Sequence, residues 1–203
     1  MRNDPTLAVR LEQLDAHPDL LTVQNGTVDL RTGELRPHRR GDLITKMADA
    51  AYLPHAVCPT FEAILAEAMG HDAALLTYVQ KVLGAALLGR QQERTILIAY
   101  GKSGTGKTLV YARAVLETLG DYGSPPSTAT PAMLRPHSKA IEIAGCIADL
   151  RAVRYAVMEP FGNPRLNEER LAAMLSPRLH GRRVYEKPFV FEAAHTVLIE
   201  ARY

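Results

Sequence analysis

Short apolar segments alternate with amphipathic segments along most of the chain, and this pattern predicts an α/β fold. Residues 95–100 form an apolar run, rich in Ile and Leu, that is too short for a helix and is expected to be a strand. The apolar runs at residues 153–158 and 196–199 are expected to be strands as well. We expect a mostly parallel sheet built around residues 95–100, with the other two strands as its neighbours and with ligands bound at the carboxyl ends of the strands.

Two amphipathic helices are predicted between residues 60 and 89. Thr60 is expected to cap the first helix, which Gly70 ends, and Asp72 is expected to cap the second, which Gly89 ends. The residues expected to face the protein interior are Phe61, Ile64, Leu65 and Ala68 in the first helix and Leu75, Leu76, Val79, Leu83 and Leu87 in the second.

The N-terminal region is expected to contain a short helical lead-in within residues 1–20, followed by a β-hairpin at residues 20–30. The hairpin turn is placed at Gln24-Asn25-Gly26, because Asn and Gly both tolerate positive φ. A second turn is expected at residues 31–34. Farther along the chain we expect a short helix near residues 131–134, a short strand at 141–144 and a helical turn at 146–151.

A glycine-rich segment follows the strand expected at residues 95–100. Its sequence, GKSGTGKT at residues 101–108, fits the phosphate-loop pattern G-x-x-x-x-G-K-[ST] without a gap. Leu109, Ala112, Leu116 and Leu119 then recur at helical spacing before Gly120. Strand, loop and helix therefore occur in the order that a nucleotide site requires, and the alternative is a Gly-rich turn that holds no ligand.

The residue types in this loop suit ATP bound with Mg²⁺. Backbone N–H groups and the helix N-terminus would face the phosphates, where both favour negative charge. Lys107 would reach the β- and γ-phosphates, and the Thr108 hydroxyl would ligate Mg²⁺. The residues expected to bind the nucleotide are Gly101, Ser103, Gly104, Thr105, Gly106, Lys107 and Thr108.

An acidic residue, Glu159, directly follows the apolar run at residues 153–158. Its carboxylate would hold the Mg²⁺ shell or polarise the attacking water, so Lys107 and Glu159 are the expected catalytic residues and Thr108 and Glu159 the expected metal-binding ones. The alternative is that Glu159 is an ordinary surface residue at a strand end.

Composition and charge leave the nucleotide interpretation unchanged. A hydrophobic content of 47% and a charged content of 23% are those of an ordinary soluble globular protein. No apolar run approaches the roughly 20 residues of a membrane span, and the N-terminus lacks a signal-peptide core, so we expect a cytoplasmic protein. Cys58 and Cys146 are expected to be reduced, buried thiols rather than a disulfide or zinc site.

Net charge gives little indication of a nucleic-acid partner. The formal value of +2 is too small to demand one, although local clusters of basic residues can matter. One such cluster consists of Arg36, His38, Arg39 and Arg40. A solvated loop is favoured over a phosphate-binding patch for this cluster.

The order of these segments resembles the superfamily 3 helicase region of phage and plasmid primases, together with the helical domain that precedes it. AYGKSGTGKT is similar to the phosphate loop of that family, and LRAVRYAVMEPFGNPRLNEERLAAML is similar to its second acidic motif and the helix that follows. The resemblance implies an AAA+-like P-loop core at residues 90–203, preceded by a hairpin and helical domain at residues 1–89.

The family's known activity is that of a hexameric, ATP-driven helicase that encircles one DNA strand during replication. The resemblance places its channel hairpin at residues 179–193, with Arg182, Arg183 and Lys187 as the side chains that would bind single-stranded DNA. The alternative is an exposed strand pair with ordinary surface charges.

Several positions depart from the family's pattern. Ala201-Arg202 stands where a polar Asn is usual, and the arginine finger would lie beyond Tyr203. We therefore expect ATP to be bound far better than it is hydrolysed. The chain is then either part of a longer helicase or a shortened, non-catalytic relative that acts as a regulator or interaction module. A small-molecule kinase has little support, because no lid segment can be identified.

Overall fold

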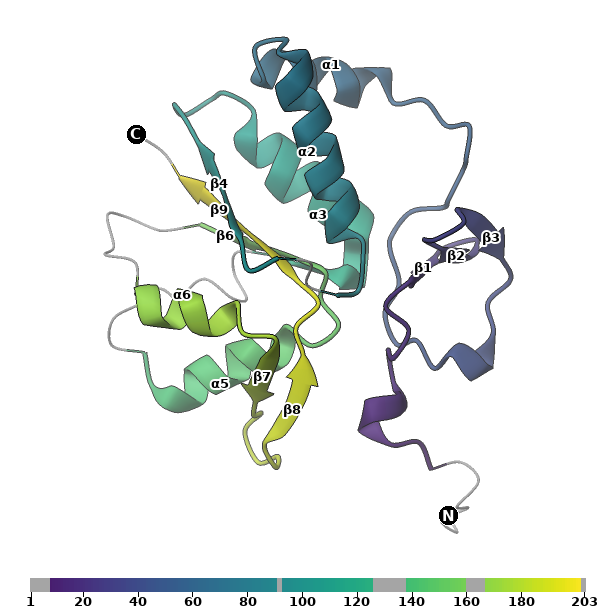
Figure 1. Cartoon of the computed structure of the whole chain (residues 1–203), viewed down its shortest axis with the longest axis vertical. Helices are drawn as coiled ribbons and strands as arrows, with labels where there is room; N and C mark the ends of the chain where they lie inside the picture. The colour runs from purple at the N-terminus through teal and green to yellow at the C-terminus, as the bar shows by residue number, and fades with distance from the viewer. Residues whose placement is uncertain (1–7, 91–92, 126–137, 160–166, 202–203) are drawn as a thin grey trace.

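The central feature of the protein is a four-stranded parallel sheet (Figure 1). The computed structural model describes residues 8–90, 93–125, 138–159 and 167–201. The strands lie in the order β4 (Ile96–Tyr100), β9 (Thr196–Ala201), β6 (Tyr155–Met158) and β5 (Gly123–Ser124). The three expected strands therefore share one parallel sheet, but the expectation that residues 95–100 lie at its centre is wrong, because β9 lies between β4 and β6 and β4 pairs only with β9 among the described strands. The short β5 adds a fourth strand that the sequence did not indicate.

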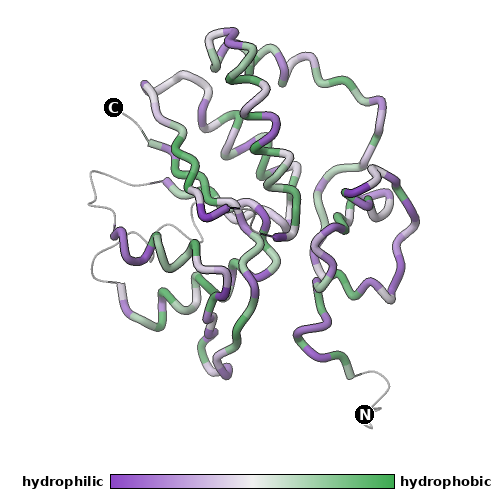
Figure 2. The backbone as a smooth tube through the Cα atoms, in the orientation of Figure 1, coloured by the Kyte–Doolittle hydropathy of each residue, from purple (hydrophilic) through white to green (hydrophobic). Residues whose placement is uncertain are grey.

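The strands β6 and β9 are buried on both faces of the sheet, which explains why they are nearly continuous apolar runs. Tyr155 and Val157 on β6 pack on one face with Leu198 of β9, while Ala156 and Met158 pack on the other. Figure 2 shows these strands as largely hydrophobic segments in the middle of the molecule.

Helices cover the two faces of the sheet (Figure 1). One layer contains α1 (Pro59–Ala68), α2 (Ala73–Ala86), a π-helix (Thr108–Ala114) and α3 (Val115–Leu119), and the opposite layer contains α5 (Ala140–Asp149), α6 (Glu168–Met174) and the hairpin of β7 (Arg178–Gly181) and β8 (Phe189–Glu192). Asp72 caps α2 as predicted, because its side chain accepts hydrogen bonds from the N–H groups of Ala74 and Leu75.

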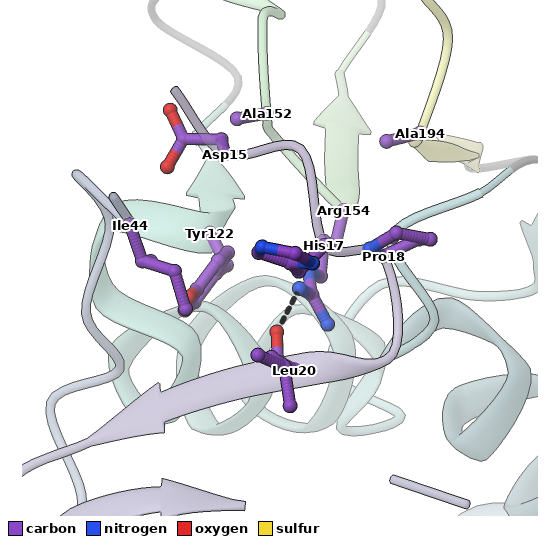
Figure 3. A pocket seen from close by; sticks show the side chains of 10 residues that line it. Asp15, His17, Pro18, Leu20, Ile44, Tyr122, Ala152, Arg154 and Ala194 are labelled. Carbon is purple, nitrogen blue, oxygen red and sulfur yellow. Dashed lines mark hydrogen bonds between the residues drawn. The ribbon is translucent and has the colours of Figure 1, made fainter. Parts of the chain in front are cut away.

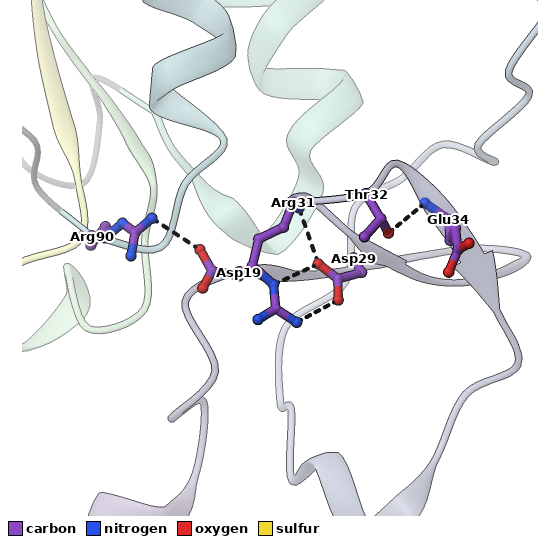
Figure 4. A network of polar contacts seen from close by, with 6 residues as sticks. All are labelled: Asp19, Asp29, Arg31, Thr32, Glu34 and Arg90. Atoms are coloured by element: carbon purple, nitrogen blue, oxygen red, sulfur yellow. Dashed lines mark hydrogen bonds and ion pairs between the residues drawn. The ribbon is translucent and has the colours of Figure 1, made fainter.

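A small antiparallel sheet of β1 (Leu20–Val23), β2 (Gly26–Asp29) and β3 (Glu34–Arg36) lies beside the core (Figure 1). The predicted hairpin and its turn at residues 24–25 are confirmed. Figure 4 shows how the second turn is held: Arg31 donates to both carboxylate oxygens of Asp29, at 3.0 and 2.7 Å. These hydrogen bonds lower the pKa of Asp29 to about 2. Single 3₁₀ turns also occur at Leu11–Gln13, Arg40–Asp42 and Gly120–Tyr122.

A buried arginine joins this small sheet to the core. Arg154, which is 5% exposed, precedes β6 and donates hydrogen bonds to the carbonyl of Leu20 at 2.5 Å and to that of Leu87 (Figure 3). Its guanidinium also stacks over the ring of Tyr122, 4.6 Å from the ring centroid. Burial lowers the pKa of Arg154. One side chain thus holds the start of β1 and the end of α2 against the central sheet.

The strand expected at residues 141–144 is wrong, because helix α5 covers these residues, whereas the helical turn expected at residues 146–151 is confirmed as far as Asp149, where α5 ends. Ile143, Cys146, Ile147 and Leu150 recur at helical spacing and all pack in the same part of the core. Gly145 has open space around it and is accommodated within the helix.

Other differences are local. Leu109 is exposed while Val110 and Tyr111 are buried, since the first two turns after the glycine loop are π-helical rather than α-helical. Leu75 is also exposed, and Cys58 lies exposed at the start of α1, which begins at Pro59 rather than Thr60.

Two further expected helical segments are the N-terminal lead-in and the helix near residues 131–134. Among its described residues, the lead-in forms only the 3₁₀ turn Leu11–Gln13. The helix expected at residues 131–134 lies outside the described residues. None of the helices in the described parts of the chain has the length and apolar character needed to cross a membrane.

Candidate functional site

The glycine-rich loop turns sharply between the carboxyl end of β4 and the π-helix. Gly104 and Gly106 have φ values of 82° and 81°, in the left-handed region that glycine adopts without strain. A Cβ atom at Gly104 would contact nothing, and one at Gly106 would lie 4.0 Å from the Cβ of Ala68. These two glycines are therefore required by the backbone conformation rather than by lack of space.

Lys107 folds back over this loop. Its side chain is only 8% exposed, and its Nζ donates to the carbonyls of Gly101 at 2.8 Å and Lys102 at 2.5 Å and to Oγ1 of Thr105 at 3.1 Å. An ammonium group has three donors, so the loop oxygens satisfy all of them. The buried ammonium group of Lys107 is thus held against the backbone of the glycine loop.

A second buried charged residue, Glu200, lies beside the loop on β9. It is 2% exposed, and its Oε1 accepts a hydrogen bond from Oγ1 of Thr108. Its other carboxylate oxygen, Oε2, has no hydrogen-bond partner among the described residues. Glu200 was not predicted from the sequence, although it is a lone acidic residue near the end of the run TVLIEA, the same pattern that indicated Glu159.

These residues surround a cleft of about 320 Å³. Ser103, Gly104, Thr105, Gly106, Lys107, Thr108, Leu109 and Glu200 line it. Six of the seven residues expected to bind nucleotide therefore meet at one site, and the seventh, Gly101, contributes the carbonyl that holds Lys107. Backbone amides, a lysine and a hydroxyl together form a donor set suited to a polyphosphate.

Glu159 follows β6 at the same edge of the sheet. The parallel register pairs Met158 with Ile199. The next residue after each of them is an acid, so Glu159 follows β6 at about the level of Glu200 on β9. Side chains alternate along strands, which places Glu200 on the sheet face that carries Leu198. Glu159 is half-buried and is not among the residues that line the cleft.

The basic residues expected to bind DNA lie in the turn between β7 and β8. The antiparallel hairpin is confirmed, and Arg182, Arg183 and Lys187 are exposed in its turn at residues 182–188. Arg183 forms an ion pair with Asp149 at 3.1 Å, and Tyr185 projects fully into solvent. The structure therefore brings the three basic residues together on one exposed turn.

Comparisons with known proteins agree with this architecture. A family model described as D5 N terminal like matches residues 1–70. The A form apo structure of the NrS-1 C-terminal region has a TM-score of 0.57 and 14% identity, with 72% of this chain and 34% of that chain covered. Another apo structure of the same region has a TM-score of 0.54 and 16% identity, with the same coverage.

The structural matches have a limited scope. At 14–16% identity they show a shared fold, and this chain spans only about 34% of the length of those chains. No curated protein matches the sequence.

Proposed function

We propose that this chain is an ATP-binding, helicase-type domain of a phage or plasmid replication protein related to the superfamily 3 primase–helicases. The observation that carries the proposal is the glycine loop at the carboxyl end of β4, with Lys107 buried at its end and Glu200 beside Thr108. The D5 N terminal like match and the sequence resemblance to primase–helicases support the replication context.

ATP would bind with its phosphates in the cleft, where the loop amides face them. Lys107 would exchange its bonds with the loop oxygens for bonds with β- and γ-phosphate oxygens. Mg²⁺, which suits the Thr108 hydroxyl and the nearby carboxylates, would neutralise charge on the phosphates when bound with the nucleotide. Glu159 would orient the attacking water, with slow turnover in this chain.

Single-stranded DNA would contact the β7–β8 turn through Arg182, Arg183 and Lys187. Such contacts with phosphates are independent of sequence and weaken with salt. In a hexameric ring, this turn would face the strand held in the central channel.

A second candidate function, a non-catalytic regulator that assembles with a complete helicase, is favoured by the exposed edge of the sheet. Among the described strands, β4 pairs only with β9. Its Ile98 and Tyr100 are 63% and 64% exposed. An open edge with apolar side chains is a surface that another chain can cover.

Titration with a fluorescent ATP analogue in the presence of Mg²⁺ tests the proposal. We expect Lys107→Ala to bind at least about tenfold more weakly than the wild type, because a hydrogen bond to a charged group contributes roughly 1.5–3 kcal/mol. Lys81→Ala on the exposed surface of α2 is the matched control and should bind like the wild type. Equal affinities for the wild type and Lys107→Ala would rule out this site.

Hydrolysis assays with the same proteins separate the two candidates. The helicase-type function predicts slow hydrolysis that single-stranded oligonucleotides increase. The regulatory function predicts nucleotide binding with no hydrolysis, whether or not DNA is present.

A further inference from the structure

Glu200 is a buried acid whose environment is incomplete. One oxygen, Oε1, accepts from Thr108, while Oε2 is buried with no hydrogen-bond partner among the described residues. None of the ion pairs found in those residues involves Glu200. Burial of a carboxylate is costly unless a positive charge or several donors accompany it. The position therefore fits a cation that binds next to Thr108.

The Thr108 hydroxyl can serve Glu200 and a cation at the same time. A hydroxyl has one hydrogen to donate and two lone pairs to offer, so Oγ1 can donate to Glu200 and still ligate a metal ion. Both residues line the cleft that also contains the glycine loop. Mg²⁺ in nucleotide sites uses one or two protein carboxylates together with phosphate oxygens and water, so a larger cluster of acids is unnecessary.

We infer that Glu200, at the end of β9, holds the divalent cation of the bound nucleotide, with Oε2 as its ligand and Thr108 as the neighbouring one. This inference rests on the proposed nucleotide site and assigns the cation to an acidic residue that was not predicted from the sequence. Glu159, which is outside the cleft lining, is then left to act on the attacking water.

The competing explanation is that Glu200 has only a structural role. A negative charge near the N-terminus of a helix is favourable, and the Thr108–Glu200 hydrogen bond would then simply fix the start of the π-helix. The two explanations differ in the effect of Glu200 on the Mg²⁺ requirement of nucleotide binding.

The test measures binding of a fluorescent ATP analogue to the full chain at increasing Mg²⁺ concentration and, separately, in EDTA. We expect Glu200→Gln to require about 10–100-fold more Mg²⁺ for half-maximal enhancement of binding, the range seen when metal-supporting groups are removed. Affinity in EDTA should stay the same or increase, because removal of a negative charge reduces repulsion of the phosphates. Glu117→Gln, an exposed acid on α3, is the matched control and should behave like the wild type.

Thermal melting of each variant shows whether the fold is retained. If Glu200→Gln is too unstable to titrate, Glu200→Asp keeps the charge on a shorter side chain and should still raise the Mg²⁺ requirement. An unchanged Mg²⁺ requirement in the folded variant, while Lys107→Ala loses binding, overturns the inference and leaves the nucleotide site standing. Failure of the wild type to bind the analogue in either condition overturns both.

Discussion

At the residue scale, the glycine loop depends on backbone conformations that other residues adopt only with strain. Gly104 has a φ of 82° and open space around its Cα. We expect Gly104→Ala to weaken ATP-analogue binding about tenfold, since the left-handed conformation costs other residues roughly 1–2 kcal/mol and the loop would shift away from it. The affinity is measured by the same fluorescence titration.

Gly145 provides the matched control for this substitution. It lies inside α5, where an added methyl group meets nothing. Gly145→Ala should leave the affinity unchanged and raise the free energy of unfolding by about 0.5–1 kcal/mol, because alanine loses less backbone freedom in a helix. Wild-type affinity in Gly104→Ala would show that the loop conformation is not the one that binds the nucleotide.

The sequence reveals residues of the site only where the pattern is local. The glycine loop is contiguous, so its geometry and the position of Lys107 could be predicted from eight residues. The Thr108–Glu200 contact joins residues 92 positions apart, and no local pattern indicates it. Glu200 could have been noticed as a lone acid at a strand end, but its partner could not.

At the scale of elements, the junction at Arg154 determines how the small N-terminal sheet is attached. Arg154 bonds to carbonyls at the start of β1 and the end of α2, and Gly89 donates to the Pro18 carbonyl at 2.9 Å nearby. We expect Arg154→Ala to lower the free energy of unfolding by about 2–4 kcal/mol, because the buried carbonyls lose a charged donor. Denaturation with urea measures this change.

Arg31→Ala is the control for the junction. Arg31 makes a close ion pair with Asp29 at 2.7 Å (Figure 4), yet its side chain is 67% exposed. Exposed pairs of this kind contribute little, because water and salt screen them. The junction would be unimportant if the two substitutions had the same small effect on stability.

The elements predicted best from the sequence are short apolar runs with turn residues at both ends. The β1–β2 hairpin and the strands β4, β6 and β9 were found for this reason. The first half of α5 was expected to be a strand, because its isoleucines resemble strand residues locally, while its second half was correctly expected to be helical. The packing of its apolar face on the core decides for a helix, and that packing is not visible in a local window.

At the scale of the whole molecule, the order of the strands creates the site. The sequence indicated that β4, β6 and β9 share one parallel sheet, but it placed β4 at the centre, whereas β9 lies between β4 and β6. This order brings the loop after β4, Glu200 on β9 and Glu159 after β6 to one edge of the sheet. Such pairing depends on burial of both faces at once, so it follows from tertiary packing rather than from any single segment.

The stability of the whole molecule should depend on pH through His195, which lies between β8 and β9 and is almost completely buried. Burial lowers the pKa of His195 from its usual 6.5 to about 4. Below pH 6.5 the unfolded chain therefore binds a proton that the folded protein excludes, and stability falls as the pH decreases toward 4. Between pH 7 and 5, His195 should account for a loss of about 2 kcal/mol in the free energy of unfolding.

Urea denaturation of His195→Leu at both pH values isolates this contribution. Its loss of stability between pH 7 and 5 should be about 2 kcal/mol smaller than that of the wild type, because leucine does not titrate. His55→Leu removes an exposed histidine and should keep the wild-type dependence. If the free energy of unfolding fell equally with pH in the wild type and in His195→Leu, the folded protein would accept a proton on the imidazole ring of His195. The layer between the β7–β8 hairpin and the sheet would then admit water.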